Sequence, residues 1–469
     1  MAQYNDRQQI FCLSMISAVC GLNFTTGSQP ELQEIATKRT QAVLSDPDQQ
    51  KLIGEWEVVW GPGIYQHDGQ GLLDSNVADS AMYMAKSKDS GESDRYIIGI
   101  SGTNLVSLHG WTVQNLSVST TRLWNKGQPW HSDPEDQTTP GIRVAAGFCE
   151  GIRILFEEMQ YNEQSLLEYL NHLTSSASKP LSITICGHSL GAALSPTLAL
   201  SLIDRRAEWD PNEKATVWAS FSSGASPGNK AFAQDYDMKL DQKTDRIWSE
   251  LDYVANTWEK DMIEGTRTFY EPYIKPTALI NAWVDWLLDQ SISSGVEYKH
   301  VWSQQEGFNL GYNPDALSSF IQFIFDFFGL SPEEQIASSL SGVVAKTILH
   351  NLGIENQSRN LIDSLSQSLK PLIKELSEKS QLGKIALPTG EIKNIVEPYV
   401  EQIIEKLQTE KSISNIKGSK NHLRLLLSTL LDFIKYISQG FYHHWDSCVE
   451  YLEVSEFIDR TYEIIKSTS

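Results

Sequence analysis

The chain has 469 residues, of which 41% are hydrophobic and 10% aromatic, a composition typical of a globular protein with a sizeable core. Its formal net charge of −21 at pH 7 argues against nucleic acid as a partner, because so acidic a surface repels the phosphate backbone. The same charge disfavours docking on anionic lipid but does not oppose transient contact with a neutral lipid interface.

Five cysteines at spacings that fit no metal site indicate free thiols in a reducing compartment. The short apolar run within residues 1–22 lacks a basic leader, so we expect an amphipathic helix there and no signal peptide. No stretch reaches the roughly 18 uncharged apolar residues of a membrane span. These features predict a cytoplasmic protein with no transmembrane segment, metal or cofactor, although secretion by a non-classical route stays open.

The order of the expected elements indicates an α/β fold. Residues 1–50 read as mostly helical, and short β-branched or aromatic runs predict strands at 56–60, 81–85, 96–100, 181–186, 218–223 and 246–250. Apolar positions at helical spacing predict helix through 147–173, after a loop at 125–141. Because strands and helices alternate from about 96 to 302, we predict a mostly parallel sheet flanked by helices.

A change of composition marks residues 313–438, where Ser, Lys, Glu, Leu and Ile dominate. Within it, residues 360–376 place their leucines and isoleucines on one helical stripe. We therefore predict a helical insertion or cap over 313–438, inside a catalytic domain made of 1–312 and 439–469.

The segment Gly187-His188-Ser189-Leu190-Gly191 fits the pattern G-x-S-x-G. An apolar run leads into it and a helix rich in small residues follows, which is the strand–turn–helix setting of a nucleophile elbow. Glycines on both sides let neighbouring backbone pass closely, and the first helical N–H groups face a developing oxyanion. The pattern predicts Ser189 as a nucleophile.

Several further blocks resemble the class 3 lipase family, α/β hydrolases that include fungal triacylglycerol lipases and plant phospholipases A1. They are IIGISGTN (97–104), HGWTVQNL (109–116), VAAGFCEG (144–151), SITICGHSLGAALS (182–195), FSSGASPGNKAFA (221–233) and ELDYVANTW (250–258). The resemblance covers about residues 80–302 and returns near 440–452. Ser101 and Ala255 depart from it, since the family usually has Arg and Pro at these positions.

The resemblance implies a Ser-Asp-His triad and an α/β-hydrolase fold. It places the acid at Asp252, with Asp245 as the alternative, and it implies a base late in the chain, at His444. His443 and His300 stay open as the base. We expect Asp446 to cap the following helix, which would leave the histidine pair on a loop.

The oxyanion donors implied by the resemblance are Thr103 and the backbone N–H of Leu190. A lid is expected over the site, formed by 105–116, 278–288 or 319–330. The expected function is that of a lipase or carboxylesterase, which hydrolyses lipid or other ester bonds through an acyl-enzyme. The alternatives are a phospholipase A-type hydrolase and a lipase-like scaffold without activity.

Overall fold

The structure is a computed structural model that describes residues 2–20, 25–67, 76–89, 91–102, 117–317, 319–320 and 419–468. The chain divides into two compact units. The first consists of Met1–Thr266, Val284–Leu310 and His443–Ser469, and the second of Arg267–Trp283 and Gly311–Tyr442. Most of the predicted insertion at 313–438 lies outside the described residues, so its boundaries stay a prediction.

A six-stranded sheet forms the centre of the first unit, in the order β1-β2-β3-β8-β9-β11. The strands are β1 (Trp56–Tyr65), β2 (Ser80–Ser87), β3 (Asp94–Ile100), β8 (Leu181–His188), β9 (Ala215–Ser222) and β11 (Thr244–Ile247). The pairs β1–β2 and β2–β3 are antiparallel, whereas β3, β8, β9 and β11 run parallel. Since Ile100 pairs with Gly187, and His188 with Ser222, the carboxyl ends of β3, β8 and β9 meet at one edge.

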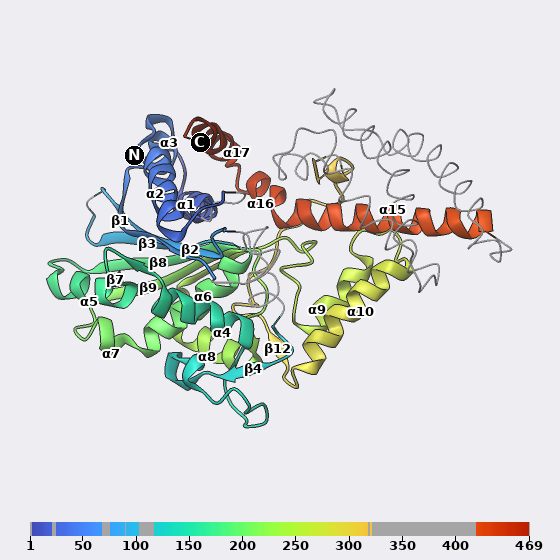
Figure 1. Cartoon of the computed structure of the whole chain (residues 1–469), viewed down its shortest axis with the longest axis horizontal. Helices are drawn as coiled ribbons and strands as arrows, with labels where there is room; N and C mark the ends of the chain where they lie inside the picture. Colours follow the sequence, from blue (N-terminus) through green and yellow to red (C-terminus); the bar gives the residue numbers. More distant parts are fainter. Residues whose placement is uncertain are drawn as a thin grey trace. The chain divides into compact units, whose positions relative to one another are not determined.

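Helices cover both faces of this sheet (Figure 1). One face carries α1 (Asp6–Cys20), α2 (Gln29–Ser45), α3 (Pro47–Ile53) and α17 (Ser455–Ser467). The other carries α4 (Ala146–Arg153), α5 (Leu166–Ser176), α6 (Leu190–Asp204), α7 (Arg206–Trp209) and α8 (Lys230–Leu240). The predicted helical start of the chain and the predicted strands are therefore present, with bounds that differ by a few residues.

The core under α1 shows why the first helices belong to this unit. Phe11, Leu13 and Ile16 of α1 are buried in the same apolar cluster as Tyr83 of β2 and Ile97 of β3. Burying a side chain of this size contributes about 1.5–3 kcal/mol. The amino-terminal helices are therefore an integral layer of the unit that holds the sheet.

One prediction is wrong within 147–173, because this segment is not continuous helix. After α4 the chain forms a π-helical turn, Ile154–Glu158, and then a hairpin of β6 (Gln160–Tyr161) and β7 (Gln164–Ser165) before α5 begins. Asn162 and Glu163 both have positive φ, 52° and 59°, as the two-residue hairpin turn requires. Ser165 then caps α5, with its backbone N–H donating to Glu168 Oε2 at 2.9 Å.

A second sheet has four strands, which neighbour one another in the order β12-β10-β5-β4. Its strands are β4 (Thr121–Leu123), β5 (Arg143–Ala145), β10 (Gly228–Asn229) and β12 (Tyr298–Lys299). The predicted loop at 125–141 contains only two short 3-10 turns, Asn125–Gly127 and Pro129–His131. The buried guanidinium of Arg143 fixes this loop by donating to the carbonyls of Asp136 and Thr139.

The remaining helices of the described residues are α9 (Lys260–Gly265), with the 3-10 turn Thr266–Thr268 after it, α10 (Ala278–Ser293), α15 (Ser419–His444) and α16 (Asp446–Tyr451). In the second unit, the rings of Tyr270 and Tyr436 meet edge to face with centroids 5.2 Å apart. Asn313 N donates to Gln439 Oε1 at 3.0 Å in the same unit. Among the described helices, none has the length and apolarity needed to cross a membrane.

Candidate active site

Ser189 lies in the turn between β8 and α6 and has a backbone conformation that side chains rarely adopt, φ 59° and ψ −122°. Its N–H donates to Ser222 O of β9 at 3.0 Å, and its carbonyl accepts from the N–H groups of Ala192 and Ala193. The turn is therefore held on both sides, by the neighbouring strand and by the first turn of α6. Ser189 is partly exposed, as a nucleophile must be.

Glycines make this turn sterically possible. A Cβ added at Gly187 would lie 2.5 Å from the carbonyl of Gly191. A Cβ added at Gly191 would collide with Ile100 O and lie 2.9 Å from Ser101 O, at the end of β3. Both glycines are thus required by close backbone approach, which matches the steric reason for their place in the motif.

Asp252 and His444 are joined directly. His444 Nδ1 lies 2.9 Å from Asp252 Oδ2, and the Asp252 side chain is fully buried while that of His444 is 13% exposed. The other oxygen of Asp252 accepts from Val254 N at 2.8 Å, which orients the carboxylate within its turn. A carboxylate on Nδ1 leaves Nε2 of His444 as the nitrogen available for proton transfer.

His188, the residue before Ser189, brings His444 to the elbow. The ring centroids of His188 and His444 are 4.8 Å apart, and the Trp445 ring meets His188 edge to face at 4.9 Å. His188 Nδ1 lies 3.0 Å from Ser222 Oγ. Burial, and then the nearness of His444, hold the pKa of His188 well below its ordinary value, so this ring stays neutral.

The other predicted histidines lie in different surroundings. His443 is buried, with Nδ1 3.1 Å from Ser249 Oγ. His300 is also buried, and its backbone N–H donates to Glu259 Oε2 at 3.2 Å. Burial, followed by the charges of Arg246 and Lys299, holds the pKa of His300 well below its usual range.

The alternative acid, Asp245, is used elsewhere. Its Oδ2 forms an ion pair with Arg7 Nε at 2.9 Å, and its Oδ1 accepts from Gln305 Nε2 at 2.8 Å. The prediction that His443 and His444 lie on a loop, before a helix capped by Asp446, is also wrong. His443 and His444 are the final residues of α15, and Asp446 lies inside α16, whose N-cap position is Trp445. The histidine pair is thus placed by a helix end.

The oxyanion site is described in part. Leu190 is the first residue of α6, and the first N–H groups of a helix have no partner within it. Gly102 passes close to the elbow, since a Cβ added there would lie 3.5 Å from Ser189 Cβ. Thr103 lies outside the described residues, as do the lid candidate 105–116 and all but two residues of 319–330, while 278–288 falls within α10.

Arg246 is a residue near the acid that sequence reasoning missed. It lies on β11 with its side chain buried, and its Nη2 donates to Ala255 O at 3.3 Å, within the turn that carries Asp252. A single arginine in a short strand gives no sequence signal of this role. Only in the folded chain does the turn at 252–255 come close enough to β11 to accept this hydrogen bond.

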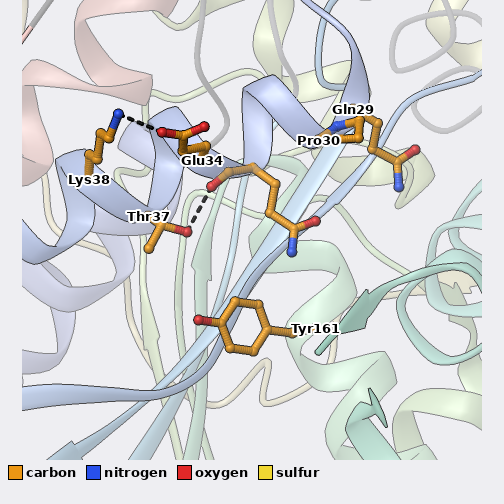
Figure 2. Close-up of a pocket in the computed structure, with 7 residues that line it drawn as sticks. Gln29, Pro30, Glu34, Thr37, Lys38 and Tyr161 are labelled. Atoms are coloured by element: carbon orange, nitrogen blue, oxygen red, sulfur yellow. Dashed lines mark hydrogen bonds and ion pairs between the residues drawn. The ribbon is translucent and has the colours of Figure 1, made fainter. Parts of the chain in front are cut away.

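A surface hollow elsewhere in the first unit does not contain this chemistry. It is lined by α2 and by Tyr161 of β6, with Gln29 and Pro30 at one end (Figure 2). Within it Lys38 pairs with Glu34, so its charges are satisfied locally. Ser189, Asp252 and His444 are not among its lining residues. In the part of the chain described here, no group of three or more His, Cys, Asp or Glu side chains is arranged to hold a metal ion.

Comparison with known proteins decides the family of this region. Residues 100–261 match the sequence model of the family described as lipase (class 3). These residues belong to the class 3 lipase family. The matched segment contains Ser189 and Asp252, and the family supports hydrolysis of a lipid ester as the class of reaction.

The fold of one solved structure agrees with this assignment. M37 lipase is similar with a TM-score of 0.56 and 23% identity, covering 70% of this chain and 92% of that chain. The mixed sheet flanked by helices is therefore an α/β-hydrolase fold. Lipase II from Rhizopus niveus aligns with 16% identity and a TM-score of 0.34, over 55% of this chain and 76% of that chain. No curated protein matches the sequence significantly.

Proposed function

We propose that this chain is a serine-dependent carboxylester hydrolase acting on lipid esters, with Ser189 as nucleophile, His444 as base and Asp252 as the acid. The observation that carries the proposal is the 2.9 Å contact between His444 and Asp252, made by a ring that also packs against His188, the neighbour of Ser189. A strained serine beside a carboxylate-oriented imidazole is suited to acyl transfer.

In the proposed reaction, His444 Nε2 takes the proton of Ser189 Oγ as that oxygen attacks the ester carbonyl. Asp252 keeps Nδ1 protonated and stabilises the imidazolium that forms. Because Asp252 is fully buried, little water competes for its charge, which strengthens this interaction.

The negative charge that develops on the carbonyl oxygen needs preorganised donors. We assign the Leu190 N–H, at the positive end of the α6 dipole, as one donor and the Thr103 hydroxyl as the other. Each such donor is worth about 3–4 kcal/mol of transition-state stabilisation. His444 then passes its proton to the leaving alcohol, and water, activated by the same ring, releases the fatty acid from Ser189.

A substrate panel with one matched pair of variants tests the proposal. The wild type and Ser189→Ala are compared on p-nitrophenyl butyrate, an emulsified triacylglycerol and phosphatidylcholine vesicles. Ser189→Ala should lower kcat roughly 10⁴-fold or more, whereas Ser182→Ala, on the distant end of β8, should leave it near the wild-type value.

Each outcome has a defined meaning. Fatty acid released mainly from phospholipid would favour the phospholipase A-type alternative. No release from any ester by the wild type would favour the inactive scaffold. Release that survives Ser189→Ala would contradict the proposed nucleophile.

A further inference from the structure

Arg246 is buried to an extent unusual for a charged side chain, with 3% of its surface exposed. Its guanidinium stacks on the Trp248 ring, with Cζ 4.3 Å from the ring centroid. Its Nη2 donates to Ala255 O at 3.3 Å, and its backbone N–H donates to Gln305 Oε1 at 2.8 Å. Burying this guanidinium costs desolvation energy, so its charged form needs an opposite charge nearby.

The carboxylates that act on Arg246 are those of Glu259 and of Asp252, the acid of the candidate triad. The carboxylate of Asp252 is fully buried, and His444 must be neutral in order to act as the proposed base beside it. Burial lowers the pKa of Arg246 to about 9, while the carboxylates of Glu259 and then Asp252 act to raise it. Arg246 therefore stays charged at pH 7, within electrostatic reach of both carboxylates.

Of the two carboxylates that act on Arg246, Glu259 already has a cationic partner. Glu259 is paired with Lys299, whose Nζ lies 2.5 Å from Glu259 Oε1. The neighbouring His300 is kept neutral by burial and by the two cations. Asp252 is then the carboxylate left for Arg246 to balance.

We propose that Arg246 is a positioning residue for the reaction: it anchors the 252–255 turn through Ala255 and balances the buried Asp252 carboxylate. The inference rests on the proposed function, because it assigns Arg246 a role only through Asp252 and His444. It would set how readily His444 takes up a proton, and so the pH range in which the enzyme works.

Among the described residues of the first unit, further titratable groups lie on the elements that carry or contact His444, Asp252 and Arg246. They are His188 from β8, His443 from the end of α15, Asp446 and Cys448 from α16, and His300 and Lys299 around β12. None of them is altered in the substitutions below, so a change in the pH profile reports the charge that was removed.

The sharpest test compares a variant that loses a positive charge with one that loses a negative charge. For each, kcat/KM on p-nitrophenyl butyrate is measured from pH 5 to 9, and the acidic limb is the fall in kcat/KM at low pH. Arg246→Met removes a cation of similar length, which makes proton uptake by His444 easier. The midpoint of the acidic limb should move up by about half a pH unit. Glu259→Gln removes an anion and should move it down. Arg246→Met should also lower kcat about tenfold with little change in KM, and Arg246→Lys should restore the wild-type limb.

Arg205→Met is the matched control. Arg205 follows the end of α6, a helix of 15 residues whose first residue adjoins Ser189, so it lies about 22 Å along that helix from the elbow. That distance exceeds the Debye length of about 8 Å at physiological salt. The acidic limb of Arg205→Met should match that of the wild type.

Three results would overturn the inference: an acidic limb unmoved in both Arg246→Met and Glu259→Gln, limbs that move in the same direction, or an equal shift in Arg205→Met. If Arg246→Met does not fold, the other two variants still test the inference. The acidic limb should move down in Glu259→Gln and stay at the wild-type position in Arg246→Lys. Wild-type turnover that does not depend on Ser189 would overturn the proposed function as well. Turnover that needs Ser189, with unmoved limbs, would overturn only the role of Arg246.

Discussion

Ser189 has a strained backbone and is partly exposed to solvent. Its left-handed backbone costs a non-glycine residue of order 1–3 kcal/mol, and the turn persists because Ser222 and the first residues of α6 fix it. The hydroxyl is thereby held at the carboxyl edge of the parallel strands, where catalytic groups of open α/β sheets collect. The backbone strain at this residue therefore has a purpose in the proposed reaction.

The proposed base can be separated from its neighbours by substitution. His444→Ala should reduce kcat about as far as Ser189→Ala, because members of a triad act as a unit. His300→Ala should retain most activity, since its backbone binds Glu259 and its ring is not the partner of Asp252. The measurement is kcat on a soluble ester, with circular dichroism to show that each variant is folded.

His443→Ala is the closest control, because it changes the adjacent residue on the same helix end. Its ring is fully buried beside Ser249, so some loss of stability is expected with catalysis largely intact. A variant of His443 or His300 that is as inactive as Ser189→Ala, while His444→Ala remains active, would reassign the base.

The sequence indicates candidate residues for the site but not their surroundings. Ser189 was marked by its glycines, and Asp252 and His444 by their order in the family pattern. The role of Arg246 depends on a turn folding over a strand, which no local pattern encodes. The neutral state of His188 depends on burial from several directions, which likewise appears only in three dimensions.

The β8–α6 elbow is the element on which the site depends. Gly191→Ala should lower the free energy of unfolding by about 3 kcal/mol, because the new Cβ would collide with the backbone carbonyls of Ile100 and Ser101. Neither carbonyl can move without disturbing the end of β3. Urea unfolding of the variant and the wild type gives the difference.

Gly91→Ala is a suitable control, since the added Cβ would meet only Ser93 O, at an ordinary 3.7 Å. It should change the free energy of unfolding by less than about 0.5 kcal/mol. Equal stabilities of Gly191→Ala and the wild type would mean that the elbow has room to relax, contrary to its geometry.

Elements with a strong periodic signal were predictable, and those set by turn chemistry were not. β3 and β8 follow from buried runs of isoleucine, and α1 to α3 from helical spacing. The hairpin at 160–165 was missed because Asn162 and Glu163 interrupt an otherwise helical pattern by adopting positive φ. The end of α15 was missed because Asp446 looked like a cap, while the helix before it runs on through His444.

At the scale of the whole molecule, stability should depend on the charge of Asp446. Burial, and then the carboxylate of Glu450, raise the pKa of Asp446 to about 6. The folded state thus binds a proton more tightly than the unfolded state, where the ordinary value is 3.8. The stability that this proton provides is present below pH 4 and lost as pH rises through 6.

Asp446→Asn should therefore raise the free energy of unfolding at pH 8 by up to about 3 kcal/mol, and the gain should vanish near pH 4. Urea unfolding at the two pH values provides the comparison. Glu450→Gln removes only the smaller cause of the raised pKa of Asp446, the charge of Glu450, and should raise the free energy of unfolding at pH 8 by less. A gain that is independent of pH would contradict the assigned ionisation.

The proposed triad joins distant parts of the chain into one unit. Ser189 and Asp252 fall within the class 3 lipase match at 100–261, whereas His444 comes from His443–Ser469, which returns to the same compact unit after the second one. The sequence predicted such an excursion and return, and the family pattern alone places the base beyond the matched segment. Because of this long separation, the sequence alone leaves His444, His443 and His300 open as the base.

Covalent labelling tests most directly whether Ser189 is a nucleophile activated by His444. The protein is treated with a fluorophosphonate, and the adduct is timed by intact mass and located by peptide mapping. We predict one adduct per chain, on Ser189, forming rapidly in the wild type and at least about 10³-fold more slowly in His444→Ala and Asp252→Asn. No adduct on Ser189, or an adduct that forms equally fast in His444→Ala, would contradict it.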